Sequence, residues 1–177
     1  MESLQDRNAG NQGDVWKHIV LLAIIRRLVE ARELTSRFRY FESHAGKGEY
    51  SLEYSKEWRH GTGHVLASTP TTERDFYLDT EAKALAKATY LGSWRLVSEY
   101  FTHFNISHAL ELHDNDPTVV EFTRLTAAAD PSIVVKMSDG FEAARDTTGR
   151  GTLPIAATLQ WQFHFRIPWE HNEKRTF

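Results

Sequence analysis

A short apolar run is followed directly by a turn that contains two glycines and a histidine. The run is Phe38-Arg39-Tyr40-Phe41, and the turn reads His44-Ala45-Gly46-Lys47-Gly48. Gly46 and Gly48 can adopt positive φ and have no Cβ, so the backbone of such a turn can approach a ligand closely. In α/β proteins, a strand that ends in a glycine turn is a common place for nucleotide-like ligands to bind. The pattern therefore predicts a nucleotide-type pocket at the end of the first strand.

A second polar segment lies upstream of this strand and opens a predicted helix. It spans residues 8–18, and apolar residues follow it at helical spacing. This spacing predicts a helix over about 14–33 that has Asp14 as its N-cap. Each segment alone is a weak signal. The polar segment and the glycine turn in this order, with His18 and His44 26 residues apart, form a specific pattern.

The two segments together resemble one enzyme family. The order Ala-Gly-Asn-x-x-Asp-Val-x-Lys-His, then a strand, then His-Ala-Gly-x-Gly-x-Tyr is similar to the RlmJ (YhiR) group of S-adenosylmethionine-dependent methyltransferases. Those enzymes methylate the exocyclic N6 of an adenine in 23S ribosomal RNA. The resemblance extends over about residues 8–145. The matching residues are Ala9, Gly10, Asn11, Asp14, Val15, Lys17, His18, His44, Ala45, Gly46, Gly48 and Tyr50, followed by Gly92-Ser93, Leu110-Glu111-Leu112-His113 and Ser138-Asp139-Gly140-Phe141.

The resemblance implies a set of cofactor contacts and one residue near the reacting group. Without it, each of these residues also has a simpler interpretation. A histidine in a loop is often only hydrogen-bonded there, an acid after a strand often caps the next helix, and a lysine on a helix is usually exposed. Both interpretations stay open from the residues alone. The implied contacts to S-adenosylmethionine are His18, His44, Ser93, Glu111, Asp139 and Gly140, and the implied catalytic residue is Lys17.

The order of the predicted elements indicates an α/β, Rossmann-like fold. Alternating strands and helices favour a doubly wound parallel sheet, in which ligands bind at the carboxyl ends of the strands. A plain dinucleotide fold has its ribose-binding acid about 20 residues after the glycine turn. The candidate here is Glu111, which we expect at the end of the second strand, so a helical insertion is predicted over about 53–104. We expect strands at about 37–43, 107–112 and 133–137 and within 152–165, and helices at about 81–91, 94–104, 117–127 and 141–146.

Composition limits the class of protein and of site. The 177 residues fit one domain, and no apolar run reaches the ~18 residues of a membrane span, so a cytoplasmic protein without a membrane or metal partner is expected. The absence of cysteine excludes disulfides and thiolate metal sites. A zinc site at His18 and His44 has no HExxH motif to support it. The net charge of −3 is not typical of a protein that binds nucleic acid through electrostatics.

Lys47 stands between two glycines, which invites comparison with an ATP-binding P-loop. That motif needs a serine or threonine directly after the lysine, because the hydroxyl binds magnesium. Gly48 follows Lys47 instead. We therefore expect Lys47 to be a solvated loop residue.

The resemblance stops at both ends of the chain. Adenine-N6 methyltransferases of this kind carry Asp-Pro-Pro-Tyr or a close relative after the fourth strand, and the aspartate is expected close to Gln160. Neither the acid nor the proline pair is present there. The family's N-terminal Tyr-x-His element falls near Ser3 and Gln5 and is also missing. Residues 1–177 are thus expected to form a single, truncated methyltransferase domain whose sheet is incomplete at the C-terminus.

Three functions remain open on these observations. The first is an RlmJ-like enzyme, or a fragment of one, that is a monomer and acts on protein-free 23S ribosomal RNA with S-adenosylmethionine. The second is a non-catalytic module that binds S-adenosylmethionine but has lost the methyl-acceptor site. The third is a nucleic-acid-binding protein linked to the use of external DNA, a role also associated with the family, which the net charge of −3 disfavours.

Overall fold

A parallel sheet forms the centre of the molecule. The computed structural model describes residues 4–31, 37–53, 55–148 and 155–156. Its main sheet has the order β5-β4-β1-β6, and β1 pairs in parallel with both β4 and β6. In chain order this is third, second, first, fourth, so the connections reverse direction beside β1. A doubly wound fold binds its ligands at such a switch point. The four strands are β1 Phe38–Glu42, β4 His108–Asp114, β5 Ile133–Met137 and β6 Ile155–Ala156.

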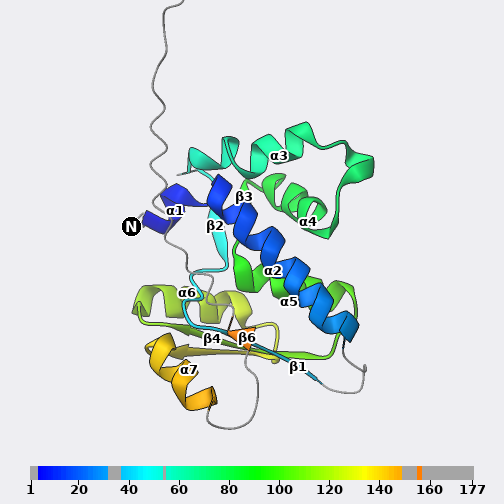
Figure 1. Cartoon of the computed structure of the whole chain (residues 1–177). Helices are drawn as coiled ribbons and strands as arrows, with labels where there is room; N and C mark the ends of the chain where they lie inside the picture. The colour runs from blue at the N-terminus through cyan, green and yellow to red at the C-terminus, as the bar shows by residue number, and fades with distance from the viewer. Residues whose placement is uncertain (1–3, 32–36, 54, 149–154, 157–177) are drawn as a thin grey trace, which may run out of the picture.

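Helices cover both faces of this sheet (Figure 1). On one face, α2 (Gln12–Ala31), α5 (Ser93–His103) and α6 (Pro117–Ala127) bury a common core with β1 and β4. Phe38 and Tyr40 of β1 point into this core, and Phe41 is buried on the opposite face, because successive side chains of a strand point to opposite faces. On the other face lies α7 (Gly140–Thr148). The predicted doubly wound parallel sheet is confirmed.

The segment between β1 and β4 carries further helices besides α5. These are α3 (Thr62–Ser68) and α4 (Phe76–Leu85), with the short 3-10 helices η1 (Glu57–Arg59) and η2 (Thr71–Glu73). The N-terminal helix α1 (Leu4–Asn8) lies beside η1. A second, two-stranded antiparallel sheet joins β2 (Glu49–Ser51) to β3 (Thr89–Leu91).

The predicted helix over 81–91 is wrong in its second half. Helix α4 ends at Leu85, and Ala88 adopts a left-handed conformation with φ of 56°. Thr89–Leu91 then pairs with β2 as a strand. Thr, Tyr and Leu fit a pleated surface well, so the tertiary pairing outweighs the helix propensity of the preceding alanines and lysines.

Some of the other predicted helix and strand boundaries are confirmed, and others are corrected. The third strand and the helix from Pro117 lie where they were predicted, and the helix over 94–104 is shifted by one residue. The predicted N-cap Asp14 is wrong, because α2 begins at Gln12 and the Asn11 side chain accepts the Asp14 N–H at 3.0 Å. Most of the predicted strand within 152–165, and Gln160 with it, lies outside the described residues.

No helix in the described part of the chain is both long enough and apolar enough to cross a membrane. Among the same residues, no group of three or more His, Asp or Glu side chains is arranged to hold a metal ion.

Candidate functional site

The glycine turn after β1 is held by contacts from β4, α5 and α6. Gly46 and Gly48 have φ of 61° and 74°, the left-handed region that glycine favours. A Cβ on Gly48 would lie 2.0 to 2.3 Å from the Trp94 indole, so the turn passes directly against α5. The Gly46 N–H donates to the Asp114 carboxylate at 3.0 Å, and the Thr123 hydroxyl donates to the Gly46 carbonyl at 2.8 Å. The turn is therefore a rigid, close-approach backbone at the carboxyl end of the sheet.

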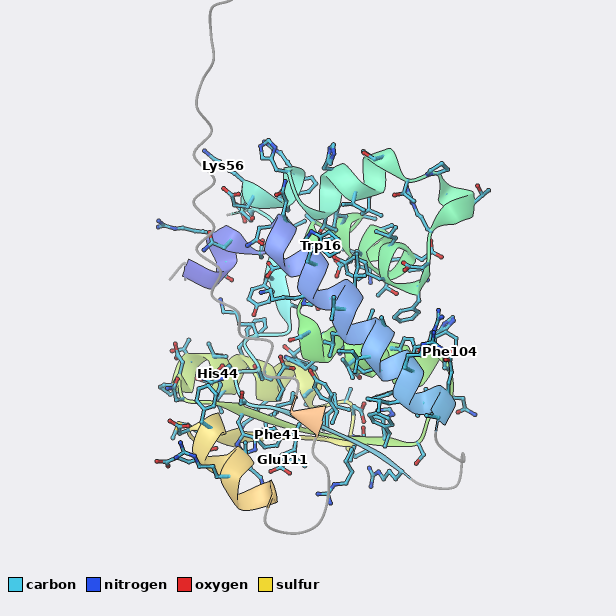
Figure 2. The ribbon with its side chains drawn as sticks, viewed as in Figure 1. Trp16, Phe41, His44, Lys56, Phe104 and Glu111 are labelled. Carbon is cyan, nitrogen blue, oxygen red and sulfur yellow. The ribbon has the colours of Figure 1, made fainter. Side chains whose placement is uncertain are left out.

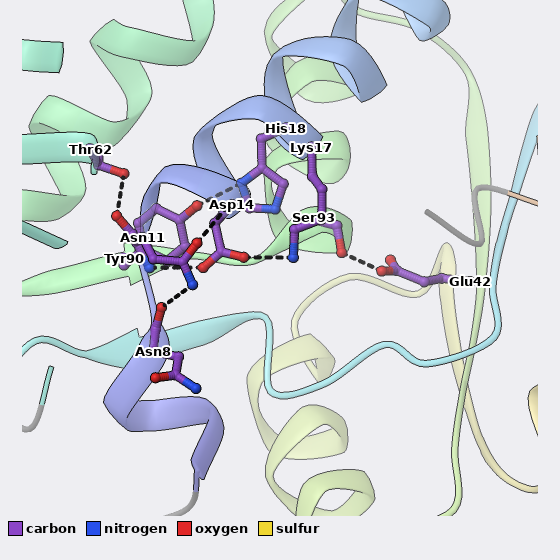
Figure 3. A network of polar contacts seen from close by, with 10 residues as sticks. Asn8, Asn11, Asp14, Lys17, His18, Glu42, Thr62, Tyr90 and Ser93 are labelled. Carbon is purple, nitrogen blue, oxygen red and sulfur yellow. Dashed lines mark hydrogen bonds and ion pairs between the residues drawn. The ribbon is translucent and has the colours of Figure 1, made fainter. Parts of the chain in front are cut away.

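The polar segment of residues 8–18 organises the start of α2. Asp14 accepts the Gly10 N–H at 3.0 Å through one oxygen and the Lys17 ammonium at 2.7 Å through the other (Figure 3). Lys17 is 38% exposed, so its charge is both paired and open to a ligand. The interpretation of Lys17 as an exposed helix cation and its implied catalytic role are both compatible with this position.

His18 lies one residue further along α2 and is buried. Its Nδ1 is 2.8 Å from the Tyr90 hydroxyl, and the two rings stack. Burial lowers the pKa of His18 to about 4, although the Asp14 charge opposes this shift. His18 is therefore a neutral imidazole near pH 7, with one donor and one acceptor nitrogen.

Ser93 binds a residue that the sequence analysis did not single out. Its hydroxyl donates to Glu42, the last residue of β1, and Tyr40 donates to the other Glu42 oxygen at 2.9 Å. Burial raises the pKa of Glu42 to about 7, against the hydrogen bonds from Ser93 and Tyr40 and the charge of Lys17. The signal for Glu42 was an acid directly after the apolar run, two residues before His44. Ser93 is also the first residue of α5.

His44, Asp139 and Gly140 meet on the side of the sheet that carries α7. The His44 ring packs edge-on against Phe141 at 4.8 Å. Asp139 accepts the N–H groups of Phe141 and Glu142 at 2.8 and 3.1 Å, and these bonds lower its pKa. Asp139 thus caps α7, as the simpler interpretation proposed.

Close backbone packing requires a glycine at the position of Gly140. A Cβ on Gly140 would lie 2.0 Å from the Ser43 carbonyl oxygen, so only glycine lets the loop after β5 lie against the loop after β1. This close approach brings the second loop of the predicted site onto the first.

Glu111 does not end its strand. Strand β4 continues for three residues, to Asp114, and Glu111 points to the opposite face from Asp114. It binds Lys136 and lies 3.1 Å from His113 Nε2, on the side that carries α7 (Figure 2). Burial alone would raise its pKa, but the hydrogen bonds from Lys136 and His113 lower it. The acid at the strand end, beside the glycine turn, is Asp114.

The expectation of a solvated Lys47 is wrong. Its ammonium lies 2.7 Å from the Asp6 carboxylate, and its side chain is only 17% exposed. The same ammonium lies 5.8 Å from the centre of the Phe122 ring, within reach of a cation–π attraction. Lys47 therefore ties α1 to the glycine turn.

Three features of the candidate site lie at the carboxyl end of the sheet. A bare backbone turn allows close approach, a buried carboxylate and hydroxyl pair stands at the end of β1, and a part-exposed cation stands on α2. Such an edge can bind a ligand that carries a ring system at one end and charges at the other. His44, Asp139 and Gly140 form a second group beside it, and Glu111 belongs to neither group.

Comparison with known proteins agrees with the motifs. No family model matches the chain. The chain is 28% identical over 153 residues to the ribosomal RNA large subunit methyltransferase J of Haemophilus influenzae, a match that covers 79% of this chain and 51% of that protein.

A solved structure supports the fold. A protein from Legionella pneumophila, assigned to the DUF519 family, superposes with a TM-score of 0.62 at 22% sequence identity, over 78% of this chain and 52% of that one. The chain thus spans about half the length of the relatives that it matches. These likenesses confirm the resemblance to the RlmJ group that the motifs predicted, together with its Rossmann-like α/β fold.

Proposed function

We propose that this chain binds S-adenosylmethionine as the donor-binding part of an RlmJ-like methyltransferase. The glycine turn at the switch point of the sheet carries this proposal, because Asp114 fixes it in a conformation that only glycine adopts readily. The likeness to a ribosomal RNA methyltransferase supplies the class of ligand. We also propose that the chain is one domain with an insertion at about 53–104.

The described residues suit the charges of this donor. S-adenosylmethionine carries an ammonium and a carboxylate on its amino-acid end. Glu42 can accept from an ammonium, since each carboxylate oxygen has lone pairs beyond those used by Tyr40 and Ser93. Lys17 offers an exposed positive charge for a carboxylate. His44, Asp139 and Gly140 remain proposed contacts through their adjacent loops, and Glu111 remains one by resemblance alone.

The proposed methyl acceptor is N6 of an adenine in protein-free 23S ribosomal RNA, by resemblance to the family. This substrate would place the chain in the cytoplasm, and we propose that it acts there as a monomer. Incubation with labelled S-adenosylmethionine and protein-free 23S RNA tests the activity. Label in the RNA supports the enzyme, and the position of the methyl group then identifies the acceptor atom.

A second candidate function is a donor-binding module without turnover. It is favoured by Gln160, which stands where the family's catalytic aspartate is expected. A neutral amide accepts weaker hydrogen bonds from the adenine amine than a carboxylate does and positions it less well, so transfer should be slow or absent. Binding of the donor without any label in the RNA, under conditions where an active RlmJ-type enzyme labels the same RNA, would select this function over the first.

A further inference from the structure

The polar segment Asn8–His18 brings a tyrosine of the insertion against His18. Tyr90 lies 72 residues further along the chain, yet its hydroxyl is 2.8 Å from His18 Nδ1. The ring centroids are 5.7 Å apart, and the ring planes differ by 18°. Tyr90 is 1% exposed, so this hydrogen bond is shielded from water. A bond in such surroundings is stronger than one at the surface.

The short sheet of β2 and β3 holds Tyr90 in place. Tyr90 pairs directly with Tyr50 across the sheet, and it packs with Ala9 and Leu52 in a small separate core. A Cβ on Gly10 would lie 3.4 Å from the Tyr90 ring and 2.9 Å from the Trp58 Cβ. The small residues Ala9 and Gly10 therefore make room for Tyr90, which gives this part of the motif a role apart from capping α2.

The direction of the hydrogen bond follows from the donors and acceptors present. A neutral imidazole has one protonated and one bare nitrogen, and a tyrosine hydroxyl has a single proton to donate. The Tyr90 hydroxyl lies 2.8 Å from His18 Nδ1, and the Tyr77 hydroxyl, which also interacts with it, can donate to the Tyr90 oxygen and leave the Tyr90 proton for Nδ1. A buried hydroxyl that failed to donate would lose a hydrogen bond with no water to replace it. Tyr90 is thus the donor, and Nδ1 is the bare nitrogen.

We propose that Tyr90 is a positioning residue that fixes His18 in the tautomer with its proton on Nε2. The stacked, hydrogen-bonded ring cannot rotate without breaking this bond, so the orientation of Nε2–H is fixed as well. His18 then presents a hydrogen-bond donor and not an acceptor to whatever binds beside α2. This consequence rests on the proposed function: the matching atom on S-adenosylmethionine is an oxygen, of its carboxylate or its ribose, and not its ammonium.

Nitrogen NMR of the full chain tests the tautomer without any ligand. With histidine labelled with ¹⁵N, the His18 signals are assigned by their loss in His18→Gln. We expect Nδ1 to have the shift of a bare, hydrogen-bonded nitrogen and Nε2 that of a protonated one. In Tyr90→Phe the Nδ1 signal should move, because only the hydroxyl is removed. A protonated Nδ1 in the unaltered protein would overturn the proposal, and this measurement does not depend on whether the variant folds.

Tyr77→Phe is the matched control. Tyr77 packs edge-on against the same imidazole at 6.2 Å, and its hydroxyl interacts with the Tyr90 hydroxyl, one contact further from His18. Removing this hydroxyl should shift the His18 nitrogen signals far less than Tyr90→Phe does. Equal changes in Tyr77→Phe and Tyr90→Phe would show a packing effect and contradict the assignment.

Calorimetry with S-adenosylhomocysteine then tests the consequence. Loss of one positioned hydrogen bond should weaken binding by about fivefold in Tyr90→Phe and leave Tyr77→Phe unchanged. Equal affinities in all three proteins would contradict the positioning role. If the NMR result is as expected but no protein binds the ligand, the proposed function fails and the tautomer assignment stands.

Discussion

Asp114 and Gly46 lie 68 residues apart in the chain and are joined by a buried hydrogen bond of 3.0 Å. The second Asp114 oxygen accepts the N–H of Asp116, also at 3.0 Å. One carboxylate at the end of β4 thus fixes the glycine turn on one side and the start of α6 on the other. The geometry of the proposed pocket depends on this carboxylate.

Asp114→Asn should destabilise the protein by about 1 to 3 kcal/mol, because one of its two N–H partners would face an amide NH₂ in place of an oxygen. Urea unfolding measures this as a lower midpoint with an unchanged slope. Asp116→Asn is the control, since Asp116 uses a single oxygen to cap α6 and asparagine caps equally well. Similar losses in both variants would contradict the role given to Asp114.

Gly48→Ala should destabilise by about 3 kcal/mol or more, because the new Cβ meets the buried Trp94 indole and φ is positive. Gly13→Ala provides the comparison. Gly13 is within α2, where alanine is favoured, and its Cβ would meet only the end of the Asn11 side chain. We expect Gly13→Ala to change the free energy of unfolding by less than about 1 kcal/mol. Thermal or urea unfolding measures the loss of stability in both variants. A Gly48→Ala protein that is as stable as the unaltered one would contradict the close packing of the turn.

Glu81 gives the protein a pH dependence that a single variant can isolate. It is fully buried, and burial raises its pKa from 4.5 to about 9. The folded protein therefore holds a proton on Glu81 that the unfolded chain releases. The stability contributed by this group is complete below about pH 4.5 and is lost as the pH rises through about 9.

Glu81→Gln cannot ionise and keeps an oxygen for the Leu91 N–H. Its stability relative to the unaltered protein should therefore rise by a few kcal/mol between about pH 5 and about pH 8. The urea midpoints of both proteins across this pH range measure their difference in stability. The other titrating groups are the same in both proteins, so their effects cancel in this difference. A difference that stays flat, or that falls with pH, contradicts the buried and protonated state of Glu81. Glu99→Gln, at a surface ion pair with Arg95, should change stability by less than about 1 kcal/mol.

The Asp6–Lys47 pair should couple α1 to the glycine turn. A double-mutant cycle with Asp6→Ala and Lys47→Ala is expected to give a coupling energy of about 1 kcal/mol, because both side chains are largely buried. The exposed Arg26–Glu30 pair of α2, with side chains 64% and 50% exposed, should give no more than about 0.5 kcal/mol in the same cycle. Equal coupling in the two pairs would show that Lys47 contributes no more than an ordinary surface charge.

Helices and strands whose own residues carry a clear pattern could be predicted from the sequence. The strand Ile133–Met137 is a β-branched run between turns, and α6 begins with Asp116 and Pro117 in the two positions that suit a helix start. The parallel sheet followed from the alternation of such elements. The pairing of Tyr50 with Tyr90 could not be predicted, because strands of three residues that lie far apart in the chain leave no periodic pattern.

The part of the site that could be predicted from the sequence is the turn, because its glycines mark both the turn and its backbone conformation. The turn at Gly46 and Gly48 is in the predicted conformation. Glu42 was missed because its burial and its partner Ser93 arise only from tertiary packing. The predicted strand over 107–112 ends two residues before β4 does, because His113 and Asp114 look like loop residues in the sequence. In the structure both are buried and hydrogen-bonded.

Titration of S-adenosylhomocysteine into the full chain tests the central claim most directly, since it requires the pocket and not the methyl acceptor. We predict saturable, one-to-one binding in the micromolar range. Binding should be weakened in Ser93→Ala, which removes a hydrogen bond to Glu42, and unchanged in Arg26→Ala, at an exposed position on α2. The absence of binding heat from a chain that is folded by circular dichroism, with either S-adenosylhomocysteine or S-adenosylmethionine, would contradict the account.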